Sequence, residues 1–186
     1  MFYERPSSEP LGHDLWYLER RDDGSSYQAV PFLQTSFSEI LAQFSPDEKW
    51  VAYASNESGR YEVYIRSFPD GGGQRLVSVN GGGQPRWSDE GGELFYVVES
   101  ILMAVPVSTR PTLTIGKPQR LFSSGDLGSA GSRYTHDITP DGKQFVMAEA
   151  VVPDDASDEP EFDGEPQTSI RIVENWYAEF RDRKQD

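Results

Sequence analysis

The chain has 186 residues, enough for one domain, and its lack of cysteine excludes disulfides, zinc thiolate sites and a cysteine nucleophile. Its formal net charge of −14 argues against nucleic acid as a partner, because phosphate backbones repel so acidic a chain. No apolar run approaches the length of a transmembrane helix, and MFYERPSSEP lacks the features of a signal peptide. The sequence therefore predicts no membrane insertion and leaves the compartment open.

Two β-strands, at residues 14–19 and 28–33, are the first predicted elements. A β-hairpin follows at residues 42–55, AQFSPDEKWVAYAS. The proline after Ser45 presets the backbone for the second position of a turn, and Asp47 can bond to the backbone just ahead of it.

The hairpin sequence occurs twice more, as PRWSDEGGELFYVV at residues 85–98 and as HDITPDGKQFVMAE at residues 136–149. The three copies align without a gap, and the shared columns are Phe44, Trp87 and Ile138; Ser45, Ser88 and Thr139; and Asp47, Glu90 and Asp141. Ser88 follows Ser45 by 43 residues and Thr139 follows Ser88 by 51, which fits the period of one four-stranded propeller blade, about 40–45 residues in the WD type. The repeat therefore predicts an all-β fold, an incomplete β-propeller.

Further strands extend each hairpin. They are predicted at residues 62–68, 75–79, 102–107, 119–122 and 169–174. The chain then divides into a half blade at 14–35, blades at 41–80 and 84–123, and a last blade at 134–180. This is a single partial propeller of about three to four four-stranded antiparallel blades, whereas propellers usually close with about 4–8. The sequence thus predicts either a fragment or half of an assembly whose ring a second copy completes.

The runs FSPDEKWVAYASNESGRYEVYIRSFP and GGGQPRWSDEGGELFYV resemble the TolB-type propeller repeat. They are similar above all to propellers at the C-terminal end of some bacterial serine/threonine protein kinases, and IRIVENWYAEF resembles the final strand of that group. The resemblance covers roughly residues 14–180, but no kinase motif occurs in the chain. The resemblance implies a non-catalytic module that binds a protein or ligand or acts as a scaffold, and that needs no cofactor. It also implies a bacterial protein, located on either side of the membrane.

The alternative is an accessory propeller of a prolyl-oligopeptidase-like hydrolase whose catalytic domain is absent here. Such a hydrolase needs a Gly-x-Ser-x-Gly elbow followed by Asp and His, and the nearest string, residues 128–132, misses that pattern. The two histidines, His13 and His136, fall short of the three or four ligands that a zinc site normally takes. The sequence therefore predicts no enzyme activity and no metal.

The candidate binding residues lie on the predicted innermost strands. Gln43, Arg86 and Asp137 share one column of the repeat, with Gln84 and His136 beside them. Because innermost strands line the propeller channel, these five are predicted to face channel water or a protein or peptide partner. In the alternative arrangement they bond one another between blades, Asp137 holds a neighbouring backbone group and His136 is half exposed.

The aromatic residues at fixed repeat positions are predicted to pack sheet on sheet rather than to form a binding platform: Phe44, Trp50, Tyr53, Trp87, Phe95, Tyr96 and Phe145. Residues 153–166 contain seven acidic residues and no basic one. They lack the order of an EF-hand calcium loop, and like charges at this density repel, so a disordered insertion in the last blade is predicted.

Overall fold

The computed structural model describes residues 1–6, 12–89, 92–128, 133–139, 143–150 and 168–173, with the backbone alone for 126, 148–150 and 168–173. In these residues the chain forms antiparallel sheets and one short 3-10 turn, η1 (Gly125–Leu127). No helix in this part of the chain is long and apolar enough to cross a membrane. The acidic stretch 153–166 lies outside the described residues.

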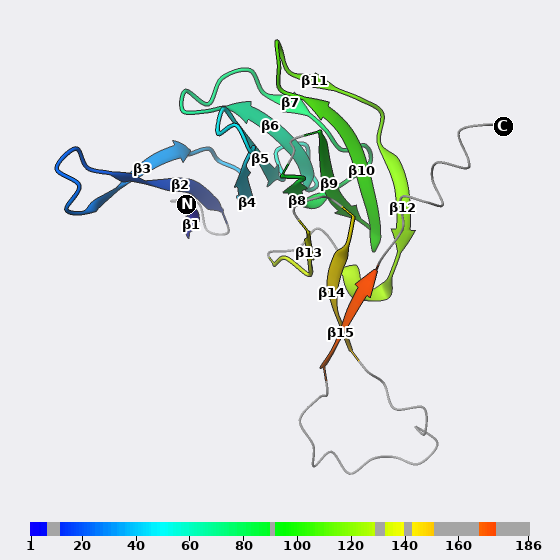
Figure 1. The fold of residues 1–186 in the computed structure, drawn as a ribbon. Coiled ribbons are helices and arrows are strands. Elements are labelled where there is room, and N and C mark those ends of the chain that lie inside the picture. Colours follow the sequence, from blue (N-terminus) through cyan, green and yellow to red (C-terminus); the bar gives the residue numbers. More distant parts are fainter. Residues whose placement is uncertain (7–11, 90–91, 129–132, 140–142, 151–167, 174–186) are drawn as a thin grey trace, which may run out of the picture.

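Four sheets fan out from the side where β4, β8 and β13 lie (Figure 1). The first sheet contains β1 (Phe2–Pro6), β2 (His13–Arg20) and β3 (Tyr27–Leu33). The second contains β4 (Glu39–Phe44), β5 (Trp50–Ser55), β6 (Glu62–Ser67) and β7 (Arg75–Leu76). The third contains β8 (Gly83–Trp87), β9 (Glu93–Val98), β10 (Ile101–Ser108), β11 (Thr114–Ile115) and β12 (Gln119–Ser123). The fourth contains β13 (His136–Ile138), β14 (Phe145–Ala150) and β15 (Thr168–Val173).

Each sheet follows the up-and-down order of a propeller blade. The second sheet runs β4-β5-β6-β7, and the chain then passes from its outermost strand to β8, the innermost strand of the third sheet. In the third sheet β11 and β12 pair with opposite ends of β10, so two short strands share the outer edge. The prediction of an all-β, incomplete propeller of three to four antiparallel blades is confirmed.

The structure adds two strands, β1 and β11, to those that the sequence predicts. β1 pairs with β2 along its whole length, and its Phe2 ring packs 4.4 Å from that of Phe44 and 5.4 Å from that of Phe32. The short segment FYERP ends in a proline that cannot donate to a ladder, so it carries little strand signal of its own. Packing against the second sheet, rather than local pattern, accounts for this strand.

The serine or threonine that the three hairpins share has the same role in all of them. The Ser45 N–H donates to Trp50 O at 2.8 Å, and the Trp50 N–H donates back to Ser45 Oγ at 3.0 Å. Ser88 and Glu93 repeat the exchange at 3.0 and 3.2 Å, and Thr139 and Gln144 at 2.9 and 3.0 Å. The spacing that the three copies share is thus the spacing of a turn closed by two hydrogen bonds.

Replacing Ser45 with alanine should lower the free energy of unfolding by about 1–2 kcal/mol, because the half-buried Trp50 N–H loses its acceptor. Ser45→Thr is the matched control, since threonine closes the third hairpin through the same bond. Urea unfolding followed by tryptophan fluorescence measures both variants. Equal losses in the two variants would show that the hydroxyl is not the cause.

Asp47, next to that turn, ties the second sheet to the third. Its Oδ1 accepts from Ser45 Oγ at 2.7 Å and from the Lys49 N–H at 3.3 Å. Its Oδ2 accepts from Thr109 Oγ1 at 3.0 Å and lies 3.7 Å from Arg110 Nε, both in the segment after β10. Burial alone would raise the pKa of Asp47, but these hydrogen bonds outweigh burial and lower it.

The cores lie between neighbouring sheets, not within a sheet. The second and third sheets enclose Ala52, Val63, Ile65, Val77, Trp87, Leu94, Tyr96, Val105 and Val107. The third and fourth enclose Phe95, Val97, Leu102, Ala104, Leu127, Phe145 and Met147, and the first and second enclose Leu15, Leu33, Tyr53 and Tyr64. The prediction that the repeat aromatics pack sheet on sheet is confirmed, with Trp50 partly buried and Phe44 against the ring of Phe2 in the first sheet.

Candidate functional site on the innermost strands

The innermost strands β4 and β8 carry the same irregularity at the same repeat position. The pairing register shifts just before Gln43 in β4 and just before Arg86 in β8. At each shift one residue adopts a left-handed backbone, Leu41 with φ 57° and Gln84 with φ 54°. Such values are uncommon outside glycine, and β-bulges of this kind re-aim the side chains beside them.

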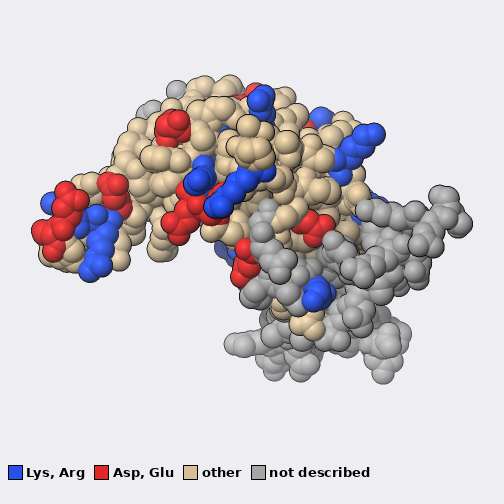
Figure 2. Space-filling view, turned by 45° about the horizontal axis from the view of Figure 1, so that its top comes forward, with Lys and Arg blue, Asp and Glu red and all other residues tan. Residues whose placement is uncertain are grey.

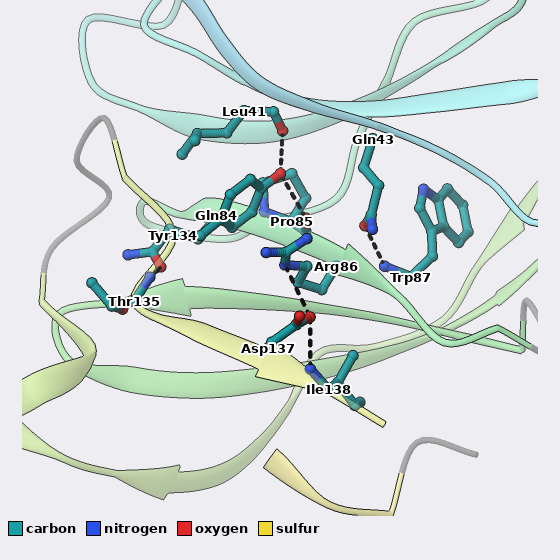
Figure 3. A network of polar contacts seen from close by, with 10 residues as sticks. All are labelled: Leu41, Gln43, Gln84, Pro85, Arg86, Trp87, Tyr134, Thr135, Asp137 and Ile138. Atoms are coloured by element: carbon teal, nitrogen blue, oxygen red, sulfur yellow. Dashed lines mark hydrogen bonds and ion pairs between the residues drawn. The ribbon is translucent and has the colours of Figure 1, made fainter. Parts of the chain in front are cut away.

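Gln43 joins the second sheet to the third. Its side-chain oxygen accepts from the Trp87 N–H of the third sheet at 2.9 Å (Figure 3). Gln43 is half buried, and this bond fits the arrangement in which polar inner-strand residues bond between blades.

Gln84 is fully buried, so the prediction that it faces the channel or a partner is wrong. Its Oε1 accepts from the Thr135 N–H at 2.8 Å and from Thr135 Oγ1 at 2.9 Å, and its Nε2 donates to Leu127 O at 3.2 Å. The bulge directs this amide between the third sheet and the segment that enters the fourth. There the amide pairs with the backbone N–H of Thr135 and the carbonyl of Leu127.

Tyr134 was not among the sequence candidates, yet it joins three sheets. It lies just ahead of β13, and its hydroxyl donates to Leu41 O of β4 at 2.9 Å, with Pro85 O of β8 at 3.3 Å. Burial raises its pKa far above the usual value, so the hydroxyl stays a donor. Nothing in the sequence distinguishes this tyrosine from the many that pack blades.

Arg86 lies between the ring of Tyr134 and the carboxylate of Asp137 (Figure 3). The guanidinium carbon is 3.6 Å from the ring centroid, well within the range of a cation–π contact. Arg86 Nε is 3.8 Å from Asp137 Oδ1, too far for a hydrogen bond, and in the described part of the chain this buried Nε has no hydrogen-bond partner. The side chains of Arg86 and Asp137 are 19% and 70% exposed, so this pair reaches solvent.

Asp137 uses one oxygen locally, since its Oδ1 accepts from the Ile138 N–H at 2.9 Å. This is the backbone bond that the alternative arrangement proposed for it. Most of the carboxylate still faces solvent, so Asp137 is also placed where a partner could reach it.

His136 is buried, which corrects the expectation that it is half exposed and the prediction that it faces the channel or a partner. Its position pairs with Met147 of β14, and neither ring nitrogen has a hydrogen-bond partner among the described residues. Burial first, and then the charge of Arg86, lower its pKa to about 4, against a smaller opposing effect of Asp137. The ring is therefore neutral at pH 7. The described residues contain no group of three or more His, Cys, Asp or Glu side chains arranged to hold a metal ion.

Comparison with solved structures shows that the chain has a known fold. TolB from Acinetobacter baumannii matches with a TM-score of 0.56 and 20% identity over 93% of this chain and 40% of that one. An oligogalacturonate lyase from Vibrio parahaemolyticus matches with a TM-score of 0.48 and 15% identity over 81% of this chain and 36% of that one. The β-propeller domain of the Trilobed protease from Pyrococcus furiosus matches with a TM-score of 0.37 and 8% identity over 93% of this chain and 64% of that one. The last two scores are too low to carry an argument. The first shows a TolB-like propeller fold, and this chain spans 40% of the length of that TolB.

No family model and no curated protein matches the sequence.

Proposed function

We propose that this chain is a non-catalytic binding module that takes a protein or peptide partner at its inner-strand surface. That surface, here called the Arg86 surface, consists of Arg86, Tyr134 and Asp137. The resemblance of residues 44–69 to propellers attached to bacterial kinases supports a role as a module that serves other domains or proteins.

The observation that carries the proposal is the loose pairing of Arg86 with Asp137. Gln43 and Gln84 already have partners in the next sheet, whereas Arg86 approaches Asp137 only to 3.8 Å, and its Nε has no hydrogen bond in the described residues. A buried donor without an acceptor costs free energy. The Nε itself lies out of a partner's reach, but 19% of the Arg86 side chain is exposed. A partner that supplies an acceptor at the exposed part meets a guanidinium that stacking on Tyr134 already holds in place.

The charge distribution elsewhere supports a polypeptide partner rather than a nucleic acid. On the face in Figure 2, lysine and arginine are scattered among aspartate and glutamate and form no continuous basic patch. Because the chain has a net charge of −14, most of it would repel a long phosphate backbone.

Arg86→Gln tests the proposal against a library of random linear peptides displayed on their encoding nucleic acid and selected on the immobilised wild-type chain. Peptides enriched on the wild type should bind Arg86→Gln at least about tenfold more weakly, because a hydrogen bond to a charged group contributes ~1.5–3 kcal/mol.

The matched control is Arg75→Gln, which removes the same charge from an exposed position on β7 and should leave binding unchanged. Unfolding midpoints of all three proteins separate lost binding from lost folding. If no peptide is enriched, or if the enriched peptides bind Arg86→Gln as tightly as the wild type, the proposal is wrong.

A further inference from the structure

We propose that the Arg86 surface recognises a carboxylate of the partner, an Asp or Glu side chain or a C-terminus, and that binding makes the buried His136 ring easier to protonate. This rests on the proposed function, and it adds the chemistry of the ligand and its coupling to pH.

The geometry of Arg86 selects the group that binds. One face of the guanidinium is covered by the Tyr134 ring at 3.6 Å, and that ring is fixed by its hydroxyl bond to Leu41 O. The guanidinium plane therefore has one orientation, and since Nε is buried, the terminal N–H groups are the donors left for a ligand. A carboxylate matches such an edge with two parallel hydrogen bonds.

The neighbouring charge favours a carboxylate over a phosphate. Asp137 lies 3.8 Å from Arg86 Nε, so an incoming anion meets one positive and one negative charge. A monoanion can replace Asp137 as the counter-ion of Arg86, whereas the second charge of a phosphate monoester is left facing the Asp137 carboxylate.

His136 is the group that responds. It is 4% exposed, and both of its ring nitrogens lack a hydrogen-bond partner among the described residues. The charged groups that act on the ring are Arg86 of β8, which opposes its protonation, and the adjacent Asp137, which favours it; its neighbour across the ladder, Met147 of β14, is uncharged. A carboxylate bound at Arg86 offsets the positive charge that opposes protonation. The pKa of His136 then rises from about 4 by about one unit, so on binding the ring takes up a proton from solvent between about pH 4 and 5, and no bond breaks in the protein.

The chain has only two histidines, so NMR of the imidazole protons reads this coupling directly. The probe is the tripeptide N-acetyl-Gly-Asp-Gly-amide at millimolar concentration on the full chain, compared with its Asn and phosphoserine analogues. The Asp peptide should shift the side-chain resonances of Arg86 and raise the pKa of His136 by about one unit, with the resonances of His13 as the internal reference. The Asn peptide should leave both unchanged.

Two variants sharpen the test. Asp137→Asn removes the competing carboxylate and should bind the Asp peptide about twofold to fivefold more tightly. Arg86→Gln should abolish the response to the peptide and raise the pKa of His136 in the free protein, because the opposing charge is gone.

Each contrary result overturns a defined part. Equal effects of the Asn peptide, stronger binding of the phosphoserine peptide, or no perturbation of Arg86 would refute carboxylate recognition. An unchanged pKa of His136 in the complex would refute the proton coupling. Neither result touches the proposed function, which fails only if no peptide is enriched in the selection or if the enriched peptides bind Arg86→Gln as tightly as the wild type.

Discussion

Gln84→Ala should lower the free energy of unfolding by about 3–5 kcal/mol, more than any other polar substitution on the inner strands. The side chain is fully buried and accepts two hydrogen bonds from Thr135 while donating one to Leu127 O. Alanine removes the acceptor of the part-buried Thr135 N–H and one of the two donors to Leu127 O, which keeps its bond from the Thr135 hydroxyl at 2.7 Å, and it also leaves a cavity. Urea unfolding followed by tryptophan fluorescence gives the size of the loss.

Gln43→Ala is the matched control for this substitution. Gln43 is half buried and its side chain accepts one bond, from the Trp87 N–H, so its loss should cost only about 1 kcal/mol. If Gln84→Ala were no more harmful than Gln43→Ala, the buried amide would not be the tie between the third sheet and the segment that enters the fourth.

The fold should lose stability in mild acid, and His136 should account for about 3 kcal/mol of that loss. Folding lowers the pKa of His136 from 6.5 to about 4, and a pKa difference of one unit corresponds to ~1.4 kcal/mol. Because the folded-state pKa is the lower one, the stabilisation is present above pH 6.5 and is lost as the pH falls toward 4. His136→Leu removes the titrating ring and should therefore flatten the curve of unfolding free energy against pH in that window.

The pH dependence of the variants must be compared with that of the wild type, because other groups titrate in the same pH range. Burial is the main cause that shifts the pKa of Glu39, and it raises that pKa. Protonation of Glu39 therefore stabilises the fold as the pH falls, which opposes the effect of His136. His13→Gln serves as the control, since His13 is half buried and contacts Ser38 Oγ at 3.3 Å. The assignment would be refuted if His136→Leu lost as much stability between pH 7 and 4 as the wild type does.

Local chemistry explains why the repeats could be predicted. Ser45, Ser88 and Thr139 close their turns through bonds within six consecutive residues, and the alternating apolar residues that follow mark a return strand. These features are present in the sequence itself. β1 is different, because Phe2 owes its place to the rings of Phe32 and Phe44 on other strands.

The site was predictable only in outline. The repeat correctly places Gln43, Arg86 and Asp137 at one position on three successive sheets, and the structure brings Arg86 and Asp137 together. The directions of the Gln43 and Arg86 side chains depend on the bulges at Leu41 and Gln84, and no sequence signal marks a left-handed backbone at a leucine or a glutamine. The same limit explains why Gln84 was expected at the channel and why Tyr134, whose partners lie on two other sheets, was missed.

The central claim is that a partner binds at the Arg86 surface, and chemical-shift mapping tests it most directly. Backbone and side-chain NMR spectra of the wild-type chain would be recorded with and without a peptide enriched in the selection. We expect the largest shifts at Arg86, Tyr134 and Asp137, with smaller ones at His136. Shifts centred instead on the outer strands β7 and β12, with Arg86 unchanged, would contradict the account.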